Sequence, residues 1–190
     1  MLFFLVFIIG CSSMGSYGYL NLVPTRRDWS VALRELPTEN REILQRRVPI
    51  YIDLVDSLDE KIYIIGDFHQ DGENVGNLHA INNWKVDLPR WVSSFNDLYG
   101  DKGGVHYRLI DAKTFGTESQ PNARDTYRFV LVWRLQEGDG RVITVMGGSQ
   151  GDGLSLLYSS AEDRQADANK AFAGGVFGVI ANIRKCAGPN

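Results

Sequence analysis

The chain has 190 residues, of which 44% are hydrophobic and 23% charged, an ordinary composition for one globular domain of this size. Its formal net charge is −3, so no global feature indicates nucleic-acid binding, which favours a strongly basic surface. No motif predicts a cofactor.

The first segment is an apolar run, Met1–Ile9, followed by Gly10 and Cys11. As a helix this run would span about 14 Å, roughly half the hydrocarbon core of a bilayer, which suits the apolar region of a secretory signal. Ile8-Ile9-Gly10-Cys11 resembles the lipobox of bacterial lipoproteins. That resemblance implies cleavage before Cys11, lipidation of its thiol and tethering to a membrane. The sequence departs from the pattern in having no Lys or Arg before Arg26, and a buried or disordered apolar N-terminus is the alternative.

This interpretation divides the chain into a signal peptide (1–10), a lipidated tether (11–24) and a single domain (25–190). Ser12 is not an acidic retention signal, so the resemblance favours the outer membrane of the cell envelope. With Cys11 lipidated, Cys186 has no disulfide partner. Without the lipid, a Cys11–Cys186 bridge becomes available in an oxidising compartment.

The domain begins with a short alternating segment, Tyr19–Val23, that predicts a strand. Thr25–Arg47 is the most charged segment of the chain, and Asp28 and Thr38 predict the N-caps of two successive helices. Because acidic and basic residues are interleaved there, we interpret it as a solvated helical face. A basic surface that contacts anionic lipid headgroups is the alternative.

From Val48 the apolar period changes to two. Val48–Leu54 and Lys61–Phe68 predict strands, with Asp56–Glu60 turning between them. Asp87–Tyr99 predicts a helix with Pro89 in its first turn and one buried stripe formed by Leu88, Trp91, Phe95 and Leu98.

Val105–Asp111 predicts the next strand, before a polar loop that runs through Gly116–Arg124. Thr126–Gln136 alternates most clearly, and with Arg141–Met146 it predicts a hairpin across the turn Glu137–Gly140. Gly147–Gly153 predicts an interruption after that hairpin.

Ser160–Lys185 predicts a closing helix with a continuous apolar stripe. Gly174, Gly175 and Gly178 would let this helix lie close to a sheet. The order of elements predicts an α+β fold: one antiparallel sheet with the closing C-terminal helix packed on it.

Two groups of residues are candidates for chemistry or binding. Two histidines and two carboxylates are weak candidates for a divalent metal site, at a spacing that matches no tight motif: His69, Asp71, Glu73 and His79. Turn-forming chemistry explains the same residues. Four aromatic residues are candidate ligand or partner contacts: Trp84, Tyr127, Phe129 and Trp133.

The element order is similar to that of the ABC-transport auxiliary lipoproteins of the PqiC-like group, with Tyr19-Leu20, Val48-Pro49, Trp91, Thr126–Met146 and Ser160–Lys185 in matching places. The resemblance implies a non-catalytic accessory subunit of an envelope transport complex, with a protein partner and no cofactor. An unpaired sheet edge or the apolar closing helix would be the natural docking site. The alternatives are a lipoprotein that binds a small ligand or lipid between the sheet and the closing helix, and a metal-dependent hydrolase that uses the His69–His79 loop.

Overall fold

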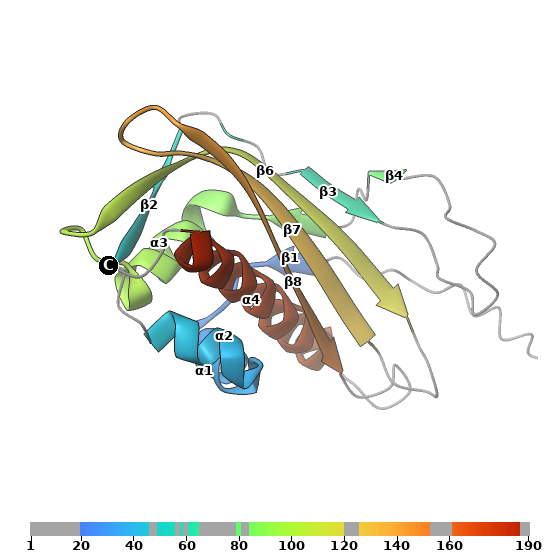
Figure 1. The fold of residues 1–190 in the computed structure, drawn as a ribbon. Coiled ribbons are helices and arrows are strands. Elements are labelled where there is room, and N and C mark those ends of the chain that lie inside the picture. The colour runs from blue at the N-terminus through green and yellow to red at the C-terminus, as the bar shows by residue number, and fades with distance from the viewer. Residues whose placement is uncertain are drawn as a thin grey trace, which may run out of the picture.

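The computed structural model describes residues 20–45, 49–55, 58, 61–64, 79–80, 84–119, 126–152 and 161–186. Their helices and strands form layers (Figure 1), with the main sheet on one side of helix α4 (Ala161–Cys186) and helices α1 (Arg26–Glu35) and α2 (Thr38–Gln45) on the other. The α+β class and the packing of the C-terminal helix on the sheet are confirmed.

The N-terminal elements are the strand β1 (Leu20–Leu22) and the pair α1 and α2. The strand before Pro24 is confirmed, but Asp28 is not the N-cap of α1. Thr25 is the N-cap, and Asp28 lies at the third helical position, where its carboxylate accepts from Thr25 N at 2.7 Å. Together they form a capping box, which satisfies donors at both positions.

The centre of the main sheet consists of β6 (Val105–Ser119), β7 (Thr126–Gln136) and β8 (Val142–Asp152), paired antiparallel. The predicted hairpin between β7 and β8 is confirmed, and Gly140 in its turn has φ +87°, a conformation that favours glycine. Two predicted ends are wrong, because β6 continues through Gly116 and β8 continues through Gly147.

The remaining strands are β2 (Ile50–Leu54), β3 (Lys61–Ile64), β4 (His79–Ala80) and β5 (Trp84–Val86). β2 and β3 do not pair with each other across a turn at 56–60. Both pair parallel with β6, one after the other along the same edge, so the main sheet is mixed. β4 pairs antiparallel with β3, and β5 pairs parallel with β1 in a separate two-stranded sheet.

The helix α3 (Leu88–Tyr99) begins at the N-cap Asp87, whose Oδ1 accepts from Arg90 N at 3.2 Å. Its predicted stripe is confirmed, with Leu88, Trp91 and Phe95 buried. Asn96 of the same helix is also buried and contacts β2 rather than solvent.

The helix α4 is buried on all sides through most of its length, because every residue of 171–180 is buried. The predicted stripe from Ala168 to Ile183 is confirmed, but α4 is the middle of the core rather than its cover. A helix that is apolar all round needs partners all round, which the sheet, α1, α2 and α3 supply. None of the helices among the described residues is long and apolar enough to cross a bilayer.

Candidate functional site

Most of the residues predicted to carry chemistry lie outside the described part of the chain. This holds for Cys11 and for His69, Asp71 and Glu73, while His79 lies in β4 with its side chain outside the description. Among the described residues, no group of three or more His, Cys, Asp or Glu side chains is placed to hold a metal ion.

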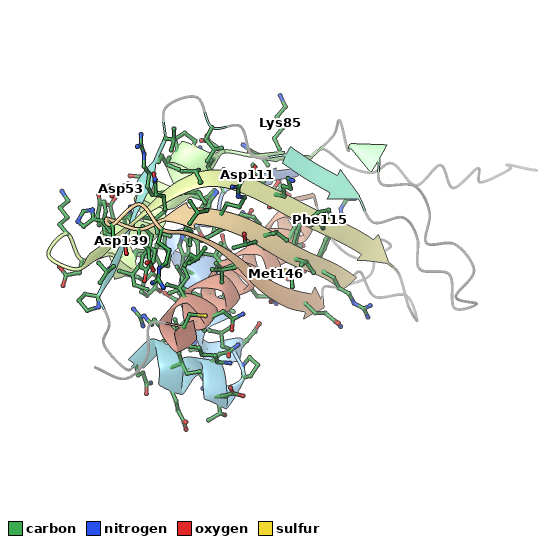
Figure 2. All side chains as sticks on the ribbon, turned by 45° about the horizontal axis from the view of Figure 1, so that its top comes forward. Asp53, Lys85, Asp111, Phe115, Asp139 and Met146 are labelled. Carbon is green, nitrogen blue, oxygen red and sulfur yellow. The ribbon has the colours of Figure 1, made fainter. Side chains whose placement is uncertain are left out.

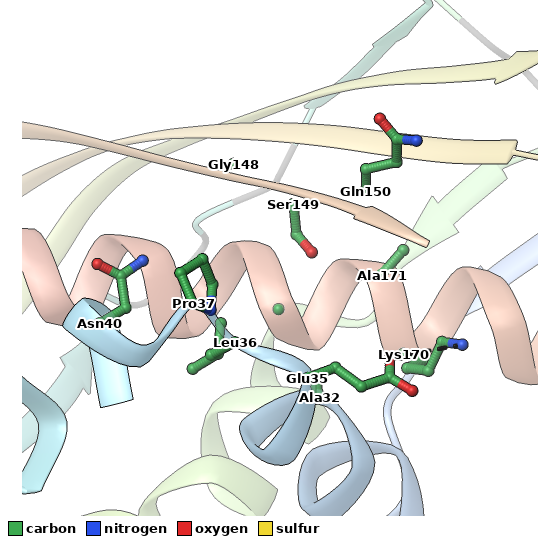
Figure 3. Close-up of a pocket in the computed structure, with 11 residues that line it drawn as sticks. Ala32, Glu35, Leu36, Pro37, Asn40, Gly148, Ser149, Gln150, Lys170 and Ala171 are labelled. Carbon is green, nitrogen blue, oxygen red and sulfur yellow. Dashed lines mark ion pairs between the residues drawn. The ribbon is translucent and has the colours of Figure 1, made fainter. Parts of the chain in front are cut away.

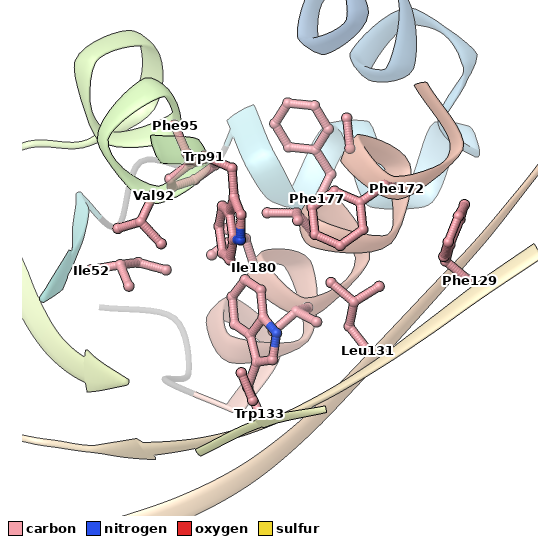
Figure 4. Packing of buried hydrophobic residues seen from close by; sticks show 14 of the residues in the cluster. Ile52, Trp91, Val92, Phe95, Phe129, Leu131, Trp133, Phe172, Phe177 and Ile180 are labelled. Carbon is pink, nitrogen blue, oxygen red and sulfur yellow. The ribbon is translucent and has the colours of Figure 1, made fainter. Parts of the chain in front are cut away.

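Three of the four candidate aromatic contacts belong to the core. The side chains of Tyr127, Phe129 and Trp133 are buried. Figure 4 shows Phe129 and Trp133 pointing from β7 into the space beneath the sheet. The Trp133 ring stacks on Trp91 at 5.2 Å, and the Phe129 ring meets Phe172 of α4 edge-on at 6.0 Å. These contacts fill the space between the sheet and α4, where the ligand-binding alternative expected a pocket.

Two further observations concern the tryptophans Trp133 and Trp84. The indole nitrogen of Trp133 is buried and has no hydrogen-bond partner among the described residues. Trp84 lies in β5, with its side chain outside the description.

A cavity of about 330 Å³ lies elsewhere, between the α1–α2 connection, β8 and α4 (Figure 3). Glu35 and Asn40 line it from the first pair of helices, Ser149 and Gln150 from β8, and Lys170 from α4. The Lys170 ammonium lies 3.6 Å from both the Glu35 and the Asp167 carboxylates. The lysine is therefore neutralised within the protein and does not form a free anion site.

A second, shallower hollow of about 430 Å³ lies between α1 and α3, lined by Arg26, Arg90 and Asp97 among others. Ser94, which lines this hollow, accepts a hydrogen bond from the Trp29 indole at 3.0 Å. The ring of Trp29 meets Phe95 and Phe177 edge-on in the aromatic core.

The N-terminal strand is fastened to α4 by two carboxamide side chains, which we call the anchor clamp: Gln165 and Asn169. Gln165 pairs with both backbone groups of Asn21, accepting from its N–H at 3.0 Å and donating to its carbonyl at 2.8 Å. Asn169 Oδ1 accepts from Val23 N at 3.1 Å and from Gln165 Nε2 at 3.0 Å. The clamp holds residues 21–23 against the buried helix. No sequence pattern singled these two residues out.

Carboxamides of the helices also pair with backbone groups of two strands in the main sheet. Asn96 of α3 accepts from Ile52 N at 3.1 Å and donates to Ile52 O at 2.8 Å, which satisfies β2. Asn182 of α4 donates to Met146 O of β8 at 2.6 Å.

The edge of β8 is further covered by α4. A Cβ atom placed on Gly178 would lie 3.2 Å from the backbone nitrogen of Gly148. The two docking places expected from the sequence, the closing helix and the sheet edge, are therefore covered along these residues.

One exposed cluster joins β2, β6 and the loop before β6. His106 Nδ1 lies 2.7 Å from Asp53 Oδ2, and His106 Nε2 lies 3.0 Å from the carbonyl of Lys102. Both partners are acceptors, so the imidazole makes both bonds only when it is doubly protonated. The bonds to Lys102 and to Asp53 accordingly raise the pKa of His106 above its ordinary value.

The end of α4 is held by ionic and polar contacts to α2. The Arg184 guanidinium donates to the Leu44 carbonyl, and burial lowers the pKa of this arginine. Lys185 Nζ lies 2.9 Å from Glu39 Oε1. Cys186 follows as an exposed free thiol.

Comparisons with known proteins find matches among solved structures but not among family models or curated proteins. No family model matches the chain, and no curated protein matches it. Among solved structures it is similar to a Xanthomonas campestris protein assigned to the family DUF330, at 11% sequence identity and a TM-score of 0.35. The similarity covers 73% of this chain and 86% of that chain. At this score it carries no functional argument.

Proposed function

We propose that the protein is a lipid-anchored lipoprotein of the bacterial cell envelope, and that it acts as a non-catalytic accessory subunit of a transport or assembly complex. The observation that carries the proposal is the segment Ile8-Ile9-Gly10-Cys11 ahead of a folded α+β domain. The accessory role is taken from the resemblance to PqiC-like lipoproteins, and Ser12 after the lipobox-like cysteine favours the outer membrane.

The distance from the anchor to the domain supports this role. Residues 12–19 separate Cys11 from β1, and so short a segment reaches at most about 30 Å when fully extended. The domain would therefore stay close to the membrane surface, near a membrane-bound partner.

The anchor clamp supports the same role. Gln165 and Asn169 fasten the backbone of residues 21–23 to α4, whose following turns lie in the middle of the core. A force on the lipid anchor would thus reach the most buried element rather than peel off an edge strand.

Metabolic labelling with a radioactive fatty acid tests the anchor. We expect the wild type to take up label and to fractionate with membranes, and Cys11→Ser to do neither. Cys186→Ser is the matched control, because it removes the exposed thiol at the other end of the chain and should keep the label. A labelled Cys11→Ser protein would overturn the proposal.

The accessory role has a separate test in a pull-down from detergent-solubilised membranes, with wild type and Cys11→Ser as paired baits. We expect a membrane protein complex to be recovered with the lipidated bait and to be depleted with the Cys11→Ser bait. Recovery of the same proteins with both baits, or of none, would count against an anchored subunit.

The cavity beside Lys170 favours a second candidate function, binding of a small ligand or lipid. Mass spectrometry of the protein purified under non-denaturing conditions tests it. Asn40→Trp should fill the cavity from its rim and exclude a bound molecule. A wild-type protein that carries no ligand, or a ligand retained in Asn40→Trp, would count against this function.

A further inference from the structure

The main sheet has one face that none of the described helices covers. Its other face packs on α4, and Figure 2 shows Asp111, Phe115 and Met146 on the side turned towards the viewer, with α4 behind the sheet. We call the outward side chains of β6, β7 and β8 the open face. It is the broad surface that remains after α4 has covered the inner face of the sheet and parts of the β8 edge.

The centre of the open face is apolar. The strand registers place Phe115 opposite Val130, and Val132 opposite Met146, so these four side chains are neighbours across three strands. Met146 is 59% exposed and Val130 is 39% exposed. The solvent side of an antiparallel sheet is ordinarily polar, and a contiguous apolar patch on it is typical of a contact surface.

Basic side chains flank this apolar centre. Along β7, Arg128 and Arg134 stand on either side of Val130 and Val132, and Lys113 is paired with Val132. Arg128 Nε donates to Gln150 Oε1 at 3.0 Å, which orients its guanidinium along the face. Asp111, opposite Arg134, lies 3.9 Å from the Lys113 ammonium. The open face is therefore locally basic although the whole chain has a formal charge of −3.

We propose that the open face docks a protein partner whose surface presents apolar side chains flanked by carboxylates. This inference rests on the proposed function, because the lipid anchor places the chain at the membrane where the partner is expected. Arginines flanking an apolar row match such a surface in charge and geometry, since guanidinium groups bind carboxylates bidentately and arginine and methionine are enriched in interfaces.

A lipid surface fits these residues less well. Attraction to anionic headgroups is worth about 1 kcal/mol per basic side chain near the surface. Asp111 offsets one of the four on this face, Arg108, Lys113, Arg128 and Arg134. That attraction has no preferred geometry, whereas carboxylates of a protein partner can pair bidentately with the guanidinium groups of Arg128 and Arg134 while its apolar side chains bury Met146.

Thiol accessibility tests the proposal in the full-length chain carrying Cys186→Ser. Val130→Cys and Met146→Cys report on the open face, and Glu42→Cys, on the exposed side of α2, is the control. We expect alkylation on the open face to be about tenfold slower in native membranes than in detergent-purified protein, the ratio for roughly 90% occupancy, and Glu42→Cys to be unaffected. Equal rates in both preparations would overturn the proposal.

Charge reversal tests the chemistry of the partner. Arg128→Glu together with Arg134→Glu should abolish the protection, whereas Arg128→Lys with Arg134→Lys should keep most of it. Protection that survives the reversal would overturn the acidic character of the partner. Circular dichroism of each variant shows that the sheet is intact.

Two further measurements identify what covers the open face. Protection restored by vesicles made only from lipids extracted from the same membranes would overturn a protein partner in favour of the bilayer. Protection that grows with the concentration of purified protein would overturn it in favour of a second copy of the chain. If Cys11→Ser still carries label but the open face remains protected in native membranes, the lipid anchor fails as proposed and the docking surface stands.

Discussion

Helix α4 lies close against the sheet at Gly147 of β8, and this close packing makes a sharp prediction about stability. A Cβ atom at this position would lie 2.1 Å from the backbone nitrogen of Val179 and 2.6 Å from the carbonyl carbon of Gly178. Ordinary van der Waals contact of a Cβ begins at about 3.4 Å. Both obstructing atoms are backbone atoms of the buried part of α4, so no side chain can rotate to make room.

We expect Gly147→Ala to destabilise the fold by about 3 kcal/mol or more, at the upper end of the range for overpacked cores, because the helix must shift away from the sheet. For a chain of this size, that loss lowers the melting temperature by about 6–12 °C. Urea unfolding followed by circular dichroism and tryptophan fluorescence measures the change.

Gly148→Ala is the matched control, since it makes the same chemical change at the next residue of the same strand. Its Cβ would lie 3.3 Å from Phe129 O and 3.7 Å from Val130 Cγ2, on the exposed face of the sheet. We expect its stability to stay within about 0.5 kcal/mol of wild type, since a shallow contact is offset by the lower entropy of the unfolded chain. A Gly147→Ala protein as stable as Gly148→Ala would refute the close packing of α4 on β8.

Two further predictions concern the polar contacts of the β2 edge. Asn96→Leu should destabilise the protein by about 2–4 kcal/mol in urea unfolding, because it leaves the N–H and carbonyl of Ile52 without partners; an unfolding midpoint equal to that of wild type would contradict this role of Asn96. The pKa of His106 is raised in the folded state, so its contacts with Lys102 and Asp53 stabilise the fold fully below the ordinary value of 6.5 and are lost as the pH rises through the folded value. We therefore expect the wild type to lose stability relative to His106→Gln as the pH rises from 6.5 through the folded pKa of the imidazole. An NMR titration that places this pKa at or below 6.5 would contradict the double hydrogen bond.

The sequence predicted well the elements whose apolar residues recur at regular spacing and all face the core. The hairpin of β7 and β8 follows from strict alternation and a glycine-rich turn, and α3 follows from its spaced apolar residues and its N-terminal Pro89. The stripe of α4 was also correct, because each of its residues faces the core whichever element lies opposite.

Two errors arose where a residue serves a backbone group other than the one that its local pattern indicated. Gly147 in β8 looked like an interruption, yet it is the residue that lets α4 approach the strand. Asp28 was predicted to be the N-cap of α1. The N-cap is Thr25, and Asp28 accepts from the Thr25 N–H at the third helical position. Local propensity reports what a residue prefers by itself and not which backbone lies against it.

The partners of β2 and β3 could not be predicted either. Their alternation indicates strands, but alternation is the same for parallel and antiparallel neighbours. Both pair with β6, across separations that only the folded chain closes.

Of the candidate site, the sequence by itself predicts the lipobox-like segment, because such a pattern is linear and needs no tertiary contact. The tertiary structure alone decided which surfaces are open. The anchor clamp of Gln165 and Asn169 and the open face around Val130 and Met146 join residues from different elements. Side chains far apart along the chain become one surface only when strand register and helix packing bring them together, and no local pattern records that register.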